Sequence, residues 1–135
     1  MTARHVLVVE DDELNARLFR KVLEKRAGCV VTVTEDPLEV MTLVRSGAIA
    51  LVVMDVSLHN STYEGRPIGG LEICQMLKND PACALVPVML ATAHAMRGDP
   101  ESLLAESGAD DYVSKPILDH QAFVEQALGL MEQAA

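Results

Sequence analysis

The alternation of two kinds of apolar segment is the feature of this sequence that most restricts its fold. Five short runs rich in β-branched residues are bounded by acidic or turn residues: Val6–Val9, Val30–Thr34, Leu51–Met54, Val86–Ala91 and Tyr112–Val113. The first, third and fourth runs are apolar throughout, which is typical of central parallel strands that are covered on both faces. We therefore expect five strands.

Between these runs, apolar residues recur at the spacing of an α-helix. A first helix is predicted around Leu14–Leu23 and is expected to end at Gly28. Four more are predicted in the following segments: Val40–Val44 after Asp36-Pro37, Leu71–Leu77, Leu103–Leu104 after Asp99-Pro100, and Phe123–Met131. Strict alternation implies parallel crossovers of one hand, so the sequence predicts a (βα)5 α/β fold, with an open five-stranded parallel sheet and helices on both faces.

Length and composition fit one globular domain. The 135 residues are 50% apolar and 23% charged, which argues against disorder. A chain of this size should bury roughly two-thirds of its unfolded surface, enough for a core without disulfides. Because the sequence shows no internal repeat or interdomain linker, we expect residues 1–135 to form a single domain.

Charge and cysteine content exclude several classes of function. Twenty acidic residues against eleven basic ones give a net charge of −9, the wrong sign for direct binding to nucleic acid. No apolar run approaches the roughly 20 residues that span a bilayer, so we expect no membrane insertion. Cys29, Cys74 and Cys83 show no paired framework or metal-ligand spacing, which predicts reduced thiols and a cytoplasmic protein.

Polar side chains follow the predicted strands at their carboxyl ends. They are Glu10, Asp11 and Asp12 after the first strand, Asp55 after the third, Thr92 at the end of the fourth, and Lys115, before Pro116, after the fifth. Ligands of open α/β sheets bind outside the carboxyl ends of the strands. We therefore expect these residues, distant in sequence, to form one site.

The acidic residues of this expected site require a cation. Two carboxylates about 4 Å apart repel by roughly 4 kcal/mol at an effective dielectric constant near 20. Oxygen ligands without histidine or cysteine favour Mg²⁺, which often binds through one or two carboxylates and a substrate phosphate. An aspartate beside Mg²⁺ can attack a phosphoryl group while a lysine and a hydroxyl group interact with its oxygens.

These motifs resemble those of receiver domains in two-component response regulators. The matching segments are Val6–Asp12, Leu51–Asp55, Ala91–Ala93 and Tyr112–Pro116, which lie in the same order and together cover nearly the whole chain. The resemblance implies a flavodoxin-like doubly wound fold. Since the chain ends with the fifth predicted helix, we expect a stand-alone receiver without an output domain.

The resemblance implies a role for most of the acidic residues. Asp55 would accept a phosphoryl group from a sensor histidine kinase or a histidine phosphotransfer protein. Asp11, Asp55 and the backbone carbonyl of Ser57 would bind Mg²⁺, and Glu10 would assist through a water molecule. Asp12 receives no role from the resemblance.

The resemblance also implies a conformational switch. The hydroxyl of Thr92 would move toward the phosphorylated aspartate, and Lys115 would form an ion pair with it. Tyr112 would change between exposed and inward positions, and the Lys115–Pro116 peptide bond would be cis. Receivers of this kind catalyse at most their own phosphorylation and dephosphorylation.

Phosphorylation would then change the surface of the fourth helix, the fifth strand and the fifth helix, around Met96, Arg97 and Tyr112. We expect this surface to control a separate protein target by direct docking. Formation of a homodimer is also possible.

His94, two residues after Thr92, could border the phosphoryl site or be exposed.

One segment departs from the receiver pattern. Receivers usually carry a proline four residues after the phosphoacceptor, where this chain has His59. The connection Leu58–Gly70 is polar, contains glycine and exceeds the usual length of a loop between a strand and a helix. Its conformation and function cannot be inherited from the resemblance.

Each motif also has a simpler structural interpretation. The acidic run Glu10–Asp12 could be a solvated helix entrance, Thr92 could cap the segment after it, and Tyr112 could pack permanently against the fourth helix. A Mg²⁺-dependent phosphohydrolase of the haloacid-dehalogenase type is the alternative function, although it requires an acid where Ser57 stands. A flavodoxin would instead need hydroxyl and glycine residues in the first loop to bind phosphate.

Overall fold

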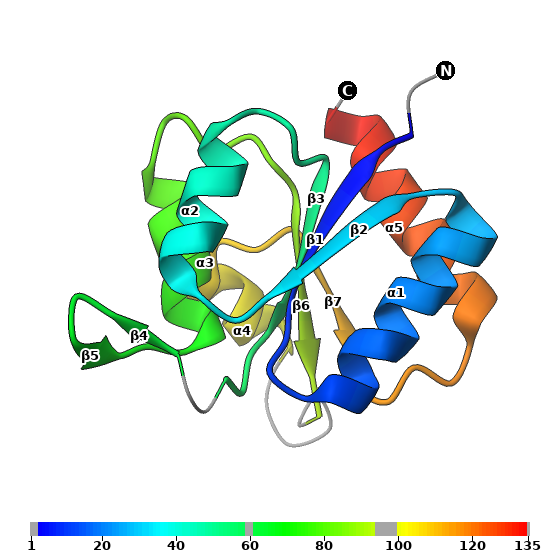
Figure 1. The fold of residues 1–135 in the computed structure, drawn as a ribbon, viewed down its shortest axis with the longest axis horizontal. Coiled ribbons are helices and arrows are strands. Elements are labelled where there is room, and N and C mark those ends of the chain that lie inside the picture. The colour runs from blue at the N-terminus through cyan, green and yellow to red at the C-terminus, as the bar shows by residue number, and fades with distance from the viewer. Residues whose placement is uncertain (1–2, 59–60, 94–99, 135) are drawn as a thin grey trace.

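The computed structural model describes residues 3–58, 61–93 and 100–134 and shows a three-layer α/β arrangement (Figure 1). The strands of the main sheet are β1 (His5–Val9), β2 (Val30–Thr34), β3 (Leu51–Asp55), β6 (Val88–Thr92) and β7 (Asp111–Ser114). All their pairings are parallel, in the order β2-β1-β3-β6-β7. The predicted open five-stranded parallel sheet is therefore confirmed.

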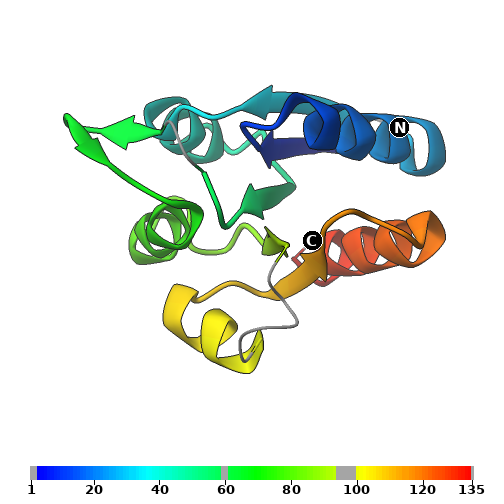
Figure 2. The ribbon, with the colours of Figure 1, turned by 90° about the horizontal axis from the view of Figure 1, so that it is seen from below.

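Helices cover both faces of this sheet. They are α1 (Glu13–Ala27), α2 (Pro37–Arg45), α3 (Gly70–Asn79), α4 (Pro100–Ser107) and α5 (His120–Ala134). Helices α1 and α5 lie on one face, whereas α2, α3 and α4 lie on the other (Figures 1 and 2). Among the described residues, no helix combines the length and apolar character needed to cross a bilayer.

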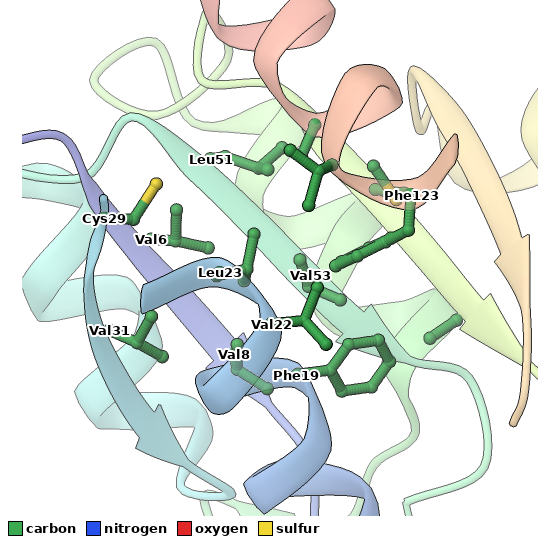
Figure 3. Packing of buried hydrophobic residues seen from close by; sticks show 14 of the residues in the cluster. Val6, Val8, Phe19, Val22, Leu23, Cys29, Val31, Leu51, Val53 and Phe123 are labelled. Atoms are coloured by element: carbon green, nitrogen blue, oxygen red, sulfur yellow. The ribbon is translucent and has the colours of Figure 1, made fainter. Parts of the chain in front are cut away.

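Alternate residues of the central strands contribute to two separate cores. Val6 and Val8 pack toward α1 and α5, whereas Leu7 and Val9 pack toward the opposite helices. Figure 3 shows the first of these clusters, where Phe19 of α1 lies close to the side chains from the sheet. The Phe19 and Phe123 rings lie 5.5 Å apart between centroids, so they join α1 to α5. Burial on both faces explains why these strands are apolar without alternation.

Capping residues account for the predicted helix ends. The Asp12 side chain accepts a hydrogen bond from the Asn15 amide at the start of α1, and Asp36 caps α2 in front of Pro37. Gly28 ends α1 in the left-handed conformation, with a φ of 67°. Asp12 is thus a helix-capping residue, as the simpler interpretation of the acidic run expects.

The predicted fourth strand begins later than its apolar run. Strand β6 starts at Val88, because Pro87 has no amide hydrogen and Val86 donates its own to the Cys83 carbonyl in a turn (3.0 Å). Cys29, Cys74 and Cys83 are buried and form no disulfide in the structure.

The long connection before α3 contains a small hairpin that the sequence analysis did not predict. Strands β4 (Thr62–Tyr63) and β5 (Arg66–Pro67) are antiparallel and joined by Glu64 and Gly65, which have φ values of 53° and 80°. Two positive φ angles are typical of a two-residue hairpin turn. Buried Ser61 anchors the hairpin, since its hydroxyl donates to the Glu35 carbonyl (2.6 Å).

Lys78 joins two connections at the amino end of the sheet, opposite the predicted site. Its ammonium group donates to the carbonyls of Ala84 (3.2 Å) and Val86 (2.9 Å) and to the Asp110 carboxylate (2.9 Å). The same Asp110 oxygen accepts the Val88 amide hydrogen (2.8 Å). One side chain from α3 therefore ties the starts of β6 and β7 together.

We predict that Lys78→Met lowers the free energy of unfolding by about 2 kcal/mol, because charged hydrogen bonds are lost and partly buried acceptors stay behind. Urea denaturation followed by circular dichroism measures the effect. The matched control is Arg17→Met, which removes an exposed ion pair with Glu13 on α1. Equal unfolding midpoints for the two variants would contradict this role of Lys78.

Candidate functional site

The topology brings the carboxyl ends of four strands together. Strands β1, β3, β6 and β7 are consecutive neighbours, and their polar end residues come from positions far apart in the sequence. Asp55 pairs in register with Ala91, the residue before Thr92. The Lys115 amide donates to the Thr92 carbonyl (3.0 Å), which keeps the end of β7 beside β6.

The Lys115 ammonium group joins two buried carboxylates at this edge. Its Nζ lies 2.9 Å from Asp55 Oδ1 and 3.1 Å from Glu10 Oε1. Asp55 and Glu10 are 2% and 3% exposed, so both acids depend on this cation for compensation. Removing the cation from such a buried ion cluster typically costs about 3 to 5 kcal/mol, because the carboxylates are then left uncompensated.

Backbone amides set the orientation of both carboxylates. The Ser57 amide donates to Asp55 Oδ1 (3.0 Å), and the Asp12 amide donates to Glu10 Oε2 (3.2 Å). These contacts leave each carboxylate little rotational freedom. The second oxygen of Asp55 receives none of the hydrogen bonds from Ser57 and Lys115.

The cluster distributes charge unequally between its two acids. Burial, reinforced by the neighbouring Asp55 carboxylate, raises the pKa of Glu10 from 4.5 to about 7. Burial would also raise the pKa of Asp55, but hydrogen bonds with Glu10, Lys115 and the Ser57 amide outweigh it and hold that pKa below its usual value. Burial alone would lower the pKa of Lys115, but its two carboxylate partners raise it. Asp55 is therefore the ionised acid of the pair near neutral pH.

The acidic residues also fit a divalent cation. Glu10, Asp11 and Asp55 each offer a carboxylate oxygen, and these oxygens lie within 4.8 Å of one another. A donor set of oxygen atoms suits Mg²⁺ better than softer metals. Asp11 is only half-buried, so solvent and ions can reach the cluster from the side on which Asp11 lies.

The family match identifies this arrangement. Residues 6–127 match the family model of the response regulator receiver domain. The chain belongs to this receiver family. The polar-differentiation response regulator DivK of Brucella anthropi is 37% identical over 114 residues, which cover 84% of this chain and 85% of that relative.

Solved receivers share the fold. The receiver domain of a Pseudomonas aeruginosa sensor histidine kinase, solved with a magnesium ion coordinated in the active-site cleft, has a TM-score of 0.80 at 21% identity. That match covers 97% of this receiver and 99% of the other chain. A sensor protein from Polaromonas has a TM-score of 0.81 at 19% identity, covering 99% and 100% of the two chains. At these identities the similarity establishes the fold alone.

The family assignment decides between the functions considered from the sequence. The receiver is a signalling domain, and the phosphohydrolase alternative is not favoured. Ser57, which stands where that enzyme class needs an acid, uses its amide to hold Asp55. The proposed metal-binding role of the Ser57 carbonyl stays a prediction.

The structure places the predicted switch residues Thr92 and Tyr112 on the neighbouring strands β6 and β7. Thr92 is 2% exposed at the end of β6. Tyr112 is partly buried and, like Leu103 and Leu104 of α4, packs against the core cluster on the α2–α3–α4 face of the sheet. Both the permanent packing of Tyr112 on α4 and its movement stay predictions.

Some predicted features lie outside the described residues, namely His59, His94, Met96 and Arg97. The segment directly after Ala93 is also outside them, so the structure does not test whether Thr92 caps it. The Glu10–Lys115 ion pair was not predicted from the sequence, because no local pattern specifies a contact between residues that far apart.

We predict that Glu10→Gln makes the metal-free receiver more stable at about pH 8 than the unchanged chain, by on the order of 2 kcal/mol, with little gain at about pH 5. The folded pKa of Glu10 exceeds its ordinary value, so the folded state holds this proton more tightly. The stability that the Glu10 carboxyl group contributes is fully present below pH 4.5 and is lost as the pH rises through about 7. Glutamine does not titrate.

Urea denaturation across this pH range, with a chelator present, measures the difference. The control is Glu24→Gln, which removes the same charge from an exposed position of α1. Saturating Mg²⁺ should abolish the advantage of Glu10→Gln, because the cation compensates the carboxylate. An advantage that does not depend on pH would refute the explanation.

Proposed function

We propose that Asp55 is the phosphoacceptor of this receiver and that its phosphorylation requires Mg²⁺. The observation that carries the proposal is the Lys115 ammonium group 2.9 Å from Asp55 Oδ1, beside two further carboxylates. This contact favours ionised Asp55, and a carboxylate must be ionised to act as a nucleophile. Glu10 and Asp11 supply negative charge that the metal offsets.

The side chains present support in-line phosphoryl transfer. A carboxylate oxygen of Asp55 attacks phosphorus, and the bond from phosphorus to the donor's imidazole nitrogen breaks, with its electron pair remaining on nitrogen. The Lys115 ammonium group is close enough to pair with the phosphoryl oxygens, and the Thr92 hydroxyl is proposed to donate to another. Mg²⁺, held by Asp11, Asp55 and the Ser57 carbonyl with Glu10 assisting through water, would supply charge neutralisation.

The same contacts suggest how phosphorylation changes the surface. A phosphoryl group on Asp55 competes with Glu10 for the Lys115 ammonium group, and it offers acceptor oxygens to Thr92 at the end of β6. Tyr112 of β7 packs against the same core cluster as Leu103 and Leu104 of α4. We infer that movement at Thr92 and Tyr112 alters the face formed by α4, β7 and α5, which would dock a downstream protein.

The receiver family implies phosphodonor and target proteins. A sensor histidine kinase or a histidine phosphotransfer protein would supply the phosphoryl group, and the only catalysis we propose is of its own phosphorylation and dephosphorylation. The net charge of −9 supports a protein target rather than nucleic acid. A cytoplasmic location and a possible homodimer stay predictions.

We predict that incubation with acetyl phosphate and Mg²⁺ adds the mass of a single phosphoryl group, and that Asp55→Asn or omission of the metal prevents it. Intact-protein mass spectrometry measures the product. Asp12→Asn is the matched control, since Asp12 is an exposed acid near the site and asparagine caps helices equally well. Phosphorylation that persists in Asp55→Asn would contradict the assignment.

Beryllofluoride, which imitates a phosphoryl group on an aspartate, tests the switch. We expect it to shift amide resonances across residues 92–116, and not only those next to the proposed metal ligands Asp11, Asp55 and Ser57. In Thr92→Ala the resonances around Asp55 should still shift, but those of β7 and α4 should not, whereas Thr92→Ser should retain both responses. If the only resonances that shift in the unchanged chain are those next to the proposed metal ligands, the result would argue against a switch.

A further inference from the structure

The start of α3 lies unusually close to the backbone of the phosphoacceptor. A Cβ atom at Gly70 would overlap the Asp55 carbonyl oxygen and lie 2.8 Å from its carbonyl carbon and 3.1 Å from Cα of Val56. Atoms at such separations must move apart. Only a residue without a side chain permits this approach of α3 to the end of β3.

Gly70 differs in this respect from the other described glycines. Gly28, Gly47 and Gly65 have positive φ angles, and a Cβ there would meet nothing within 4 Å. Gly108 would meet only the flexible Lys78 side chain. Gly70 has no positive φ, so space against the Asp55–Val56 peptide is what this position requires.

The peptide beside Gly70 is held from the other side as well. The Val56 amide donates to the Ala91 carbonyl of β6 (3.0 Å), and the next amide, that of Ser57, donates to Asp55 Oδ1 (3.0 Å). The turn that carries the phosphoacceptor is thus enclosed between β6 and α3. A side chain at position 70 would have to displace either this turn or the helix.

Helix α3 has little freedom to move away. Its first turn is fixed by the Gly69 amide, which donates to the Glu72 carboxylate (3.3 Å), and by the Ile73 amide, which donates to the Gly69 carbonyl (3.1 Å). Ile73, Cys74 and Leu77 are at most 1% exposed in the core below. A close-packed core of this kind resists displacement, so the turn must absorb much of the shift.

We propose that Gly70 is a positioning residue for Asp55: its missing side chain lets α3 hold the Asp55–Ser57 turn in the geometry needed for metal binding and phosphoryl transfer. The inference rests on the proposed function of Asp55. A displacement on the order of 1 Å at a reacting group can cost about 100-fold in rate.

Gly70→Ala tests this role, with Gly69→Ala as the matched control. A Cβ at Gly69 would meet the Val56 carbonyl oxygen at 3.7 Å and a Glu72 oxygen at 3.9 Å, which are ordinary contacts. We expect Gly70→Ala to weaken Mg²⁺ binding and to slow phosphorylation by acetyl phosphate, each by about 10- to 100-fold. The amide resonance of Ser57 should also shift. For Gly69→Ala, the Mg²⁺ affinity and the phosphorylation rate should both stay within about threefold of those of the unchanged chain, a smaller effect than the one expected for Gly70→Ala.

A stability control separates positioning from simple destabilisation. Ile49→Val shortens a buried side chain before the start of β3, far from the site, and should lower stability without changing Mg²⁺ affinity. All rates are compared at temperatures where circular dichroism shows each variant folded, with trimethylamine oxide added if Gly70→Ala needs it.

Normal Mg²⁺ affinity and phosphorylation in folded Gly70→Ala would overturn the inference about Gly70 but leave the proposed function of Asp55 intact. A variant that stays unfolded even with the osmolyte would also overturn it, because Gly70 would then be required for folding itself. Absence of phosphorylation in the unchanged chain would instead refute the proposed function of Asp55. These outcomes are distinguishable in a single set of measurements.

Discussion

The contact of the Lys115 ammonium group with the carboxylates of Asp55 and Glu10 is the interaction on which the site depends. Two acids that are almost inaccessible to water can stand side by side only with cationic compensation. The sheet order provides it, because the end of β7 delivers the lysine next to the ends of β6 and β3. Burial and pairing together leave Asp55 ionised while Glu10 more readily keeps a proton.

The rest of the fold gives this cluster a rigid support and an open side. Apolar side chains on both faces of the central strands fix the sheet between two helical layers. At its carboxyl edge, β6 and Gly70 enclose the turn after Asp55, so Asp55 is positioned by backbone contacts as well as by charge. Half-buried Asp11 lies on the accessible side of the site. A rigidly held Asp55 beside an exchangeable ion pair suits the proposed switch, in which a new phosphoryl group would redirect Lys115 without unfolding the core.

Sequence reasoning succeeded where short-range patterns carry the information. Apolar runs predicted the strands, and Asp36-Pro37 and Gly28 marked helix ends that the structure confirms. It failed for the β4–β5 hairpin, because strands of two residues are too short to show a period, although Glu64-Gly65 is compatible with a tight turn. The sequence assigned Glu10 only an indirect metal contact, whereas the structure shows it paired with Lys115.

The sequence by itself determined the order of strands and helices and the kinds of side chain that follow each strand, since both depend on neighbours within a few residues. Only the tertiary structure decided the distances among Glu10, Asp55 and Lys115, which of the two acids more readily keeps a proton, and how closely α3 approaches the backbone of Asp55. These properties depend on burial and on contacts between residues far apart in the chain. Electrostatic and packing energies change steeply over an ångström, a scale that the spacing of residues along a chain does not specify.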